Sequence, residues 1–393
     1  MSASLVTLAL WVAGLCAAAQ FAKVGLVLPE LSRVYPGAGA TLGLLVSAIS
    51  VVGALLGLLA GALAARLGAR RLLIGGLALG AVVSALQATL PPLPVLLASR
   101  VVEGVAHLAI VVSAPTLIAS LAGERLRPVA MTLWGTFFGV AFASTAWLGL
   151  PLVEAHGVGA LFLAHGACTA AVALLLARLL PHEPLATRTG PPFTPRGIAR
   201  RHVEAWSSPF VAAPAAGWLF YTITFVALLA VLPGLVPPEE RAFTATALPL
   251  ASIGSSMTLG VVLLRAMTAV SVLGVGFGAA ALACLTLLVW PGEPLPCILL
   301  FAALGLVQGA SFASIPQLNP RAPDQALANG ALAQAGNIGN ACGTPLLLAL
   351  LAAGGLGATF AVVIGCYVTA LAVHASMARR RRTQRREAST TVA

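Results

Sequence analysis

Charged side chains are scarce in this chain of 393 residues. Asp, Glu, Lys and Arg make up 8% of the sequence, and 59% of the residues are hydrophobic. A typical soluble domain carries about 25% charged residues. So few charges cannot cover a surface that faces water, and the composition therefore excludes a water-soluble domain.

The motifs of several enzyme classes are also missing. The sequence holds no GxSxG, no HExxH and no phosphate-binding GxxxxGK[ST] loop, and its six cysteines form no CxxC pair. These absences argue against hydrolase chemistry, a metal site, a disulfide framework and direct use of ATP. We expect a protein that is not an enzyme and that needs no metal or cofactor.

Long apolar runs are what the sequence has instead. A helix needs about 20 apolar residues to cross a bilayer, and such runs recur along the whole chain. The sequence predicts an all-α integral membrane protein with twelve membrane helices, over residues 5–29, 41–64, 72–90, 93–120, 129–152, 158–180, 209–236, 243–264, 267–290, 295–318, 327–352 and 358–377.

The arginines between these segments predict the orientation. One set of alternate loops, together with the C-terminal tail, carries 18 arginines, whereas the other set carries Arg33 and Arg241. Basic loops stay in the cytoplasm, so both termini and the connector 182–208 are expected there, in a multi-pass protein of the plasma or bacterial inner membrane. The basic tail at 379–393 is expected to meet anionic lipid rather than nucleic acid.

The two halves of the chain resemble each other. Gly61 and Arg66 end the second predicted helix in a G-x4-R pattern, which returns as Gly260 and Arg265 at the end of the eighth. The sequence therefore predicts two pseudo-symmetric six-helix bundles joined by the long connector. The expected domains are residues 1–181, the connector 182–208, residues 209–378 and the tail 379–393.

The loop after the second predicted helix resembles a signature of the major facilitator superfamily. Gly61, Arg66, Gly68, Arg70 and Arg71 match its pattern G-x-L-a-D-R-x-G-R-R, although an alanine stands where the family has Asp. The arginines of this motif are expected to clamp the junction between helix and loop. The missing Asp means that the interaction attributed to it in the family does not carry over.

A second match lies in the fourth predicted helix. Arg100 and Gly104 resemble the R-x-x-x-G signature of the same family, which is often linked there to proton coupling. The resemblance extends over essentially the full chain and implies the family's twelve-helix fold and a transport function. It does not imply a substrate, because one fold can serve many functions.

Arg100, Glu103 and His107 fall on one face of the fourth predicted helix, as does Gly104. Glu103 is the only acid placed inside a predicted span. A mobile proton on Glu103 or His107 would suit a proton-coupled carrier, with Arg100 tuning its release. The alternative is an Arg100–Glu103 ion pair that only fixes helix packing. We interpret His165, in the sixth predicted helix, as a packing residue.

Lys23 is the only lysine of the chain and lies inside the first predicted helix, near Gln20. An ammonium within a membrane is costly and marks a candidate functional site. Lys23 could face a central cavity, or its long side chain could reach the outer headgroups. In the first case Lys23, Arg100 and Glu103 leave one positive charge in excess, which favours a small organic anion or zwitterion.

The second half offers uncharged candidates for substrate binding. Trp218 and Tyr221 in the seventh predicted helix form either a substrate wall or packing contacts. Gln308 in the tenth, and Gln334 and Asn337 in the eleventh, carry amides that could bind substrate, although the glycines near the last two also suit close helix packing.

These observations predict a proton-coupled secondary transporter that works as a monomer, with a small-molecule substrate, protons and the bilayer as its partners. An efflux carrier for amphipathic drugs or metabolites is the alternative, because the apolar and aromatic lining is large. A membrane receptor on the same fold is a minor alternative, since the loops are too short to hold a sensory domain.

Overall fold

The computed structural model describes the chain except residues 1–2, 60–66, 122–129, 132, 182–193 and 393. Gly61 and Arg66 of the loop motif thus lie outside the described residues. The first half contains α1 (Ala3–Gly25), α2 (Leu28–Val34), α3 (Leu42–Ser47), α4 (Ser50–Leu56), α6 (Ala69–Ala88), α7 (Leu93–Leu121), α9 (Phe137–Ser144), α10 (Leu150–His156) and α11 (Val158–Leu179).

The connector ends in α12 (Pro195–Ser207), and the second half follows. It contains α13 (Ala212–Val231), α14 (Arg241–Ser255), α15 (Val261–Ala266), α16 (Ala269–Val289), α17 (Pro294–Leu318) and α18 (Ala322–Val392). A five-residue π-helical turn joins α9 to α10 (Thr145–Gly149), and another joins α14 to α15 (Ser256–Gly260).

The twelve predicted membrane helices are confirmed. Ten described helices are long and apolar enough to cross a membrane, and the last of them spans Pro323–Gln384. That segment holds two helices, because the backbone is not helical at Gly355 (φ 65°, ψ −161°). The second predicted helix appears as α3 and α4 with the 3₁₀ turn Gly57–Leu59, and the last residues of its predicted range lie outside the described part of the chain.

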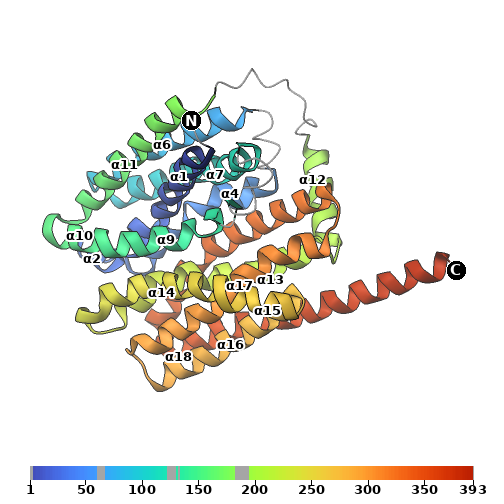
Figure 1. The fold of residues 1–393 in the computed structure, drawn as a ribbon. Coiled ribbons are helices and arrows are strands. Elements are labelled where there is room, and N and C mark those ends of the chain that lie inside the picture. The colour runs from blue at the N-terminus through green and yellow to red at the C-terminus, as the bar shows by residue number, and fades with distance from the viewer. Residues whose placement is uncertain (1–2, 60–66, 122–129, 132, 182–193, 393) are drawn as a thin grey trace.

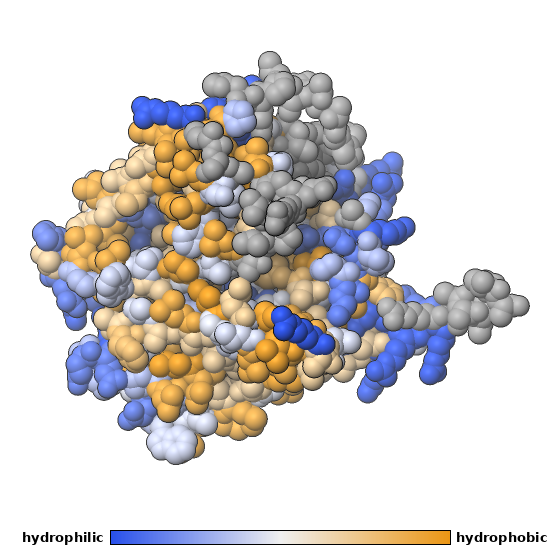
Figure 2. Space-filling view, in the orientation of Figure 1, coloured by the Kyte–Doolittle hydropathy of each residue, from blue (hydrophilic) through white to orange (hydrophobic). Residues whose placement is uncertain are grey.

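The helices are arranged in two groups. In Figure 1 the first half lies above the second, and α12 and the C-terminal end of α18 lie toward the end of the molecule opposite α2 and α10. Apolar side chains cover most of the visible face in Figure 2, while hydrophilic ones gather toward its two ends. A bilayer would surround the apolar zone between those ends.

Close helix contacts repeat between the halves, as expected for a duplication. A Cβ atom added to Gly76 of α6 would lie 3.0 Å from the carbonyl oxygen of Ala106 in α7. In the second half, a Cβ atom on Gly276 of α16 would lie 3.2 Å from the carbonyl oxygen of Ala303 in α17. The same pair of helices therefore packs through the same kind of glycine in each half.

A second pair of glycines repeats in the same way. An added Cβ atom on Gly104 of α7 would collide with the carbonyl oxygen of Ile49, and one on Gly305 of α17 with the carbonyl oxygen of Ser252. The helix packing thus relates Gly104 to Gly305. Gly309, one turn further along α17, instead faces the Ser256 hydroxyl.

Contacts between the halves occur near both ends of the bundle. At one end, Arg241 at the start of α14 donates to Glu30 of α2 (Nη1–Oε1 2.8 Å) and to the carbonyl oxygen of Leu26 (2.9 Å). At the other end, Gln334 of α18 donates to the carbonyl oxygen of Ala54 in α4 (3.1 Å). Polar side chains thus bridge the two halves near both ends of the bundle.

The glycine contacts predict a contrast between two neighbouring positions. Gly76→Ala should destabilise the protein by about 1–3 kcal/mol, because the new methyl group overpacks the α6–α7 contact. Gly75→Ala is the matched control, since an added Cβ there meets no atom within 4 Å. Thermal unfolding of both variants in detergent measures the difference. Equal unfolding temperatures would contradict the packing described for the first half.

Candidate functional site

Lys23 lies in the interior of the first half, with none of its surface exposed. An ammonium group has three N–H donors, and the structure offers an oxygen to each of them. The Nζ atom donates to the Ser84 hydroxyl (2.5 Å), to the amide oxygen of Gln87 (2.8 Å) and to Oε1 of Glu103 (2.8 Å). The charge of Lys23 is therefore fully bonded inside the protein.

Glu103 of α7 is equally buried and receives three donors. Its Oε1 atom pairs with Lys23, and its Oε2 atom accepts from Nη1 of Arg100 and from the side-chain amide of Gln87 (2.9 Å). Two cations thus share one carboxylate. A carboxylate bonded in this way is stabilised in its ionised form, because each donor favours the negative charge.

Arg100 has a second anchor in addition to Glu103. Its Nε atom donates to the carbonyl oxygen of Leu45 in α3 (2.6 Å), which ties α7 to the second membrane helix. The Nη2 atom is buried and has no hydrogen-bond partner among the described residues. Arg100 therefore serves both as a charge partner and as a brace between helices.

His165 packs α11 against α1 and α6, and in addition it belongs to this network. Its Nε2 atom lies 2.9 Å from the carbonyl oxygen of Cys16, which can only accept, so Nε2 carries the proton. The Nδ1 atom then has a free lone pair, 2.8 Å from the Ser84 hydroxyl and 3.5 Å from Nζ of Lys23. No sequence pattern indicates this contact, because α11 and α1 meet only in the fold.

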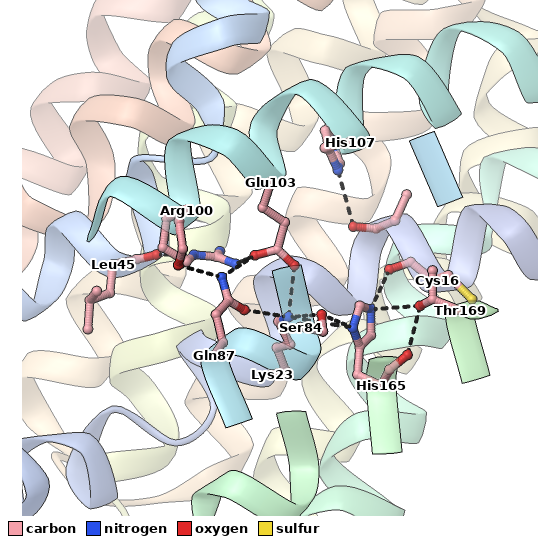
Figure 3. A network of polar contacts seen from close by, with 12 residues as sticks. Cys16, Lys23, Leu45, Ser84, Gln87, Arg100, Glu103, His107, His165 and Thr169 are labelled. Atoms are coloured by element: carbon pink, nitrogen blue, oxygen red, sulfur yellow. Dashed lines mark hydrogen bonds and ion pairs between the residues drawn. The ribbon is translucent and has the colours of Figure 1, made fainter. Parts of the chain in front are cut away.

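Four membrane helices supply the side chains of the network, and α3 adds a carbonyl oxygen (Figure 3). Lys23 comes from α1, Ser84 and Gln87 from α6, Glu103 and its neighbours from α7, and His165 from α11. We call this set the Lys23 network; its members are Lys23, Ser84, Gln87, Arg100, Glu103 and His165. Because it joins most helices of the first half, a change in its charge acts on how that half packs.

Neither expectation for the position of Lys23 is met. Its side chain does not reach the outer headgroups, since it is wholly buried against Glu103. It does not line an open cavity either, because none of its surface is accessible. The aromatic ring of Phe162, 5.3 Å from Nζ, covers the ammonium on another side. Lys23 reaches neither the headgroups nor an open cavity because its ammonium forms an ion pair with Glu103 inside the first half.

Two other predicted residues lie beside the Lys23 network. The Nδ1 atom of His107 lies 3.1 Å from the carbonyl oxygen of Ala17, a contact that Figure 3 draws as a dashed line. Its ring also meets the edge of Phe21, with 5.1 Å between ring centroids. Gln20 is fully buried, and neither atom of its amide has a partner among the described residues.

Aromatic rings form a continuous chain between the two halves. In the first half, Trp134 stacks on Phe137 (4.5 Å between centroids), which meets Phe138 (6.1 Å). Phe138 then approaches Phe225 of α13 across the contact between the halves (6.5 Å). No charged side chain is needed to hold these rings together, and the contact is apolar.

The chain of rings continues along one face of α13. Tyr221 stacks on Phe225 (4.8 Å) and on Trp218 (4.4 Å), and Trp218 meets Phe312 of α17 (5.3 Å). Phe312 is 46% exposed and Trp218 is half-buried, so this end of the row presents ring surface that a ligand could cover. We call the row from Trp134 to Phe312 the aromatic wall; its members are Trp134, Phe137, Phe138, Phe225, Tyr221, Trp218 and Phe312.

The predicted amides of the second half have other neighbours. Gln308 accepts from Ser252 of α14 at 3.5 Å. Gln334 bonds the second membrane helix and also lies 3.0 Å from Nε2 of His202 in α12. Asn337 faces Gly53 of the second helix and donates to the carbonyl oxygen of Ala333. Gln334 and Asn337 thus lie where the two halves meet, and their role as substrate ligands stays a prediction.

Comparisons with known proteins agree with this architecture. The family model of the Major Facilitator Superfamily matches residues 10–318, which is more than half of the chain. The chain belongs to the Major Facilitator Superfamily. It is therefore a multi-pass membrane protein of a transporter family, as the resemblance of its two motifs implied.

A solved structure of this superfamily type has the same fold. The crystal structure of a bacterial homologue of the human lysosomal transporter Spinster, in an inward-facing and occupied conformation, is similar with a TM-score of 0.72 and 15% sequence identity. The match covers 96% of this chain and 97% of that chain. None of the curated proteins compared with the chain gives a significant match.

The described residues of the superfamily motifs have structural tasks. Gly68, with φ 83°, allows the turn before α6. Arg70 donates to the carbonyl oxygens of Leu180 (3.2 Å) and Ala177 (2.8 Å), so it ties the start of α6 to the end of α11. The predicted clamp at the end of the second helix stays a prediction. Arg71 is exposed. Gly104 lets α7 approach the second membrane helix, as described above.

The burial of Glu103 predicts a large effect on stability. Glu103→Gln should destabilise the protein by about 3–5 kcal/mol, because it leaves Lys23 and Arg100 without their counter-charge. Glu204→Gln is the matched control. Glu204 is 51% exposed in its pair with Arg200, so its loss should cost about 0–1 kcal/mol. Thermal unfolding in detergent compares the two variants, and a smaller effect for Glu103→Gln would contradict the network.

Proposed function

We propose that the chain is a proton-coupled secondary transporter whose two six-helix halves, residues 1–181 and 209–378, rock about a central substrate site. One observation carries the proposal: three charged side chains and a histidine are bonded together inside the membrane-spanning part of one half. Ionisable residues in such a place are costly and serve ion or proton pathways in many transporters.

The distribution of charge between the halves supports this division of work. The Lys23 network lies wholly in the first half, while α13, α16 and α17 of the second half contain no Asp, Glu, Lys or Arg. Gain or loss of a proton would therefore change the packing of one half alone. A change in one half relative to the other is what alternating access requires.

The polar contacts between the halves suit such a motion. The Arg241–Glu30 pair is about one-fifth exposed on each side, and it closes one end of the bundle. Water can reach a partly exposed pair of this kind, so it can break and re-form during a cycle. The arginine distribution supports an outer position for that end. It also supports a cytoplasmic position for both termini and the connector 182–208, with the protein in a plasma or bacterial inner membrane.

The buried position of Lys23 bears on the substrate. A small organic anion would pair with an ammonium that faces the cavity, whereas Lys23 uses all its donors on Ser84, Gln87 and Glu103. The aromatic wall is the surface that can meet a ligand between the halves. We therefore favour an amphipathic compound with a flat apolar body, and keep a small organic anion as the second candidate because the Lys23 network carries one positive charge in excess.

Flux measurements test the proposed function directly. The protein in liposomes with an imposed pH gradient should accumulate ethidium, an amphipathic aromatic cation, or anilinonaphthalene sulfonate, an amphipathic aromatic anion. Glu103→Gln should abolish this gradient-driven flux, because the Lys23 network can no longer hold its charges together. Lactate serves as the small anion. Driven flux of lactate alone would favour the second candidate, and no pH-driven flux of any probe would contradict the proposal.

The aromatic wall predicts which tryptophan matters for binding. Trp218→Ala should weaken the apparent affinity for the transported aromatic probe about 2- to 12-fold, which corresponds to losing a ring contact of about 0.5–1.5 kcal/mol. Trp147→Ala is the matched control, because Trp147 is 70% exposed on the outside of the bundle. Saturation curves of flux give both affinities. The same loss in both variants would show that the wall is not the binding surface.

A further inference from the structure

The Lys23 network contains one positive charge more than its bonds require. Glu103 neutralises one cation, while Lys23 and Arg100 are both wholly buried, and His165 is neutral in the tautomer set by Cys16. A net charge in a medium of low dielectric constant is costly, and a titratable group relieves the cost by changing its protonation state. The loss of one proton from this network would therefore remove the cost of its excess positive charge.

Arg100 and Glu103 are both excluded as the group that exchanges this proton. Arg100 keeps its charge at any pH at which proteins fold. Glu103 accepts from Lys23, Arg100 and Gln87, and a protonated carboxyl would have to give up at least one of these donors. Protonating Glu103 would also raise the net positive charge of the network. Loss of a proton from Lys23, in contrast, leaves Arg100 and Glu103 as a balanced pair.

We propose that Lys23, and not Glu103, carries the coupled proton, and that Ser84 and His165 are the relay through which the proton leaves. The proposal rests on the proton-coupled transport proposed above. In this cycle Glu103 stays ionised throughout. Neutral Lys23 no longer needs the carboxylate, which is then bonded by Arg100 and Gln87 alone, so the contact between α1 and α7 weakens.

The geometry gives the relay its direction. The Ser84 hydroxyl accepts from Lys23 at 2.5 Å, and it therefore turns its own hydrogen toward Nδ1 of His165 at 2.8 Å. When Lys23 gives its proton to the Ser84 oxygen, Ser84 passes its original proton to Nδ1. The N–H bond of the ammonium breaks, a new N–H bond forms on the imidazole, and the serine is unchanged. His165 then holds the charge until the proton leaves the network.

The surroundings of Lys23 leave few other groups that could take part. Glu103 and Arg100 face it from α7, His165 faces it from α11, and α6 contributes the neutral side chains of Ser84 and Gln87. The helices α3, α9 and α13 also pack on α1 and contain no charged residue. His107, the other histidine nearby, is turned to the carbonyl oxygen of Ala17.

Lys23 can be observed alone because the chain contains no other lysine. Lysine labelled with carbon-13 at Cε gives one signal in the full-length protein, and its chemical shift distinguishes the ammonium from the neutral amine. We expect this signal to move from the charged to the neutral position within the pH range in which the protein transports. A signal that stays at the charged position over that whole range would overturn the proposal.

Substitutions at Lys23 provide a second test with ethidium or anilinonaphthalene sulfonate in liposomes. Lys23→Arg keeps the charge but cannot release it, and Lys23→Gln has no charge to release. Both should lose pH-driven accumulation and fall to the level of protein-free liposomes, while their thermal unfolding shows whether they fold. If folded Lys23→Arg keeps pH-driven accumulation, the assignment of the proton to Lys23 is wrong.

The role of Ser84 in the relay can be tested by measuring pH-driven flux in Ser84 variants. Ser84→Ala removes the hydroxyl that links Lys23 to His165 and should slow pH-driven flux, whereas Ser84→Thr keeps a hydroxyl and should restore it. Equal flux in the alanine and threonine variants would overturn the role of Ser84. A wild-type protein without pH-driven flux of these probes would contradict the proposed function itself, whatever the lysine signal shows, so the two failures can be told apart.

Discussion

The ion pair between Lys23 and Glu103 is the contact on which the first half of the molecule depends. Each group would be costly alone inside a membrane, and each is wholly buried. Burial of one therefore requires the other, and the remaining donors and acceptors follow: Gln87 and Ser84 complete the ammonium shell, and Arg100 joins the carboxylate. In this way, one lysine in α1 determines how α6, α7 and α11 pack around it.

The two halves share a helix layout but differ in what fills their interiors. The glycine contacts of α6 with α7 return in α16 with α17, whereas the charges of the first half have no counterpart in the three helices α13, α16 and α17 of the second. In their place, Tyr221, Trp218 and Phe312 extend the aromatic wall. We infer a division of work in which the first half responds to protons and the second half offers apolar surface to the substrate.

The sequence predicted the fold better than it predicted the site. Apolar length and arginine position depend on the bilayer, so twelve spans could be read directly, and the i,i+3 spacing predicted the pairing of Arg100 with Glu103. The partners of Lys23 could not be read, because they are 61 to 142 residues away in the chain and depend on how helices rotate. For the same reason the contact of His165 with the Lys23 network could not be predicted, since its helix shows no polar pattern around it.

We expect Glu103 to remain a carboxylate while the Lys23 network exchanges a proton. Infrared difference spectra of the protein between the two ends of its working pH range, compared with those of Glu103→Gln, isolate the bands of this side chain. If Glu103 stays ionised, no carbonyl band of a protonated carboxyl is lost on substitution. A band of a protonated Glu103 that appears as the pH is lowered, and is absent in Glu103→Gln, would show that Glu103 itself takes up the proton.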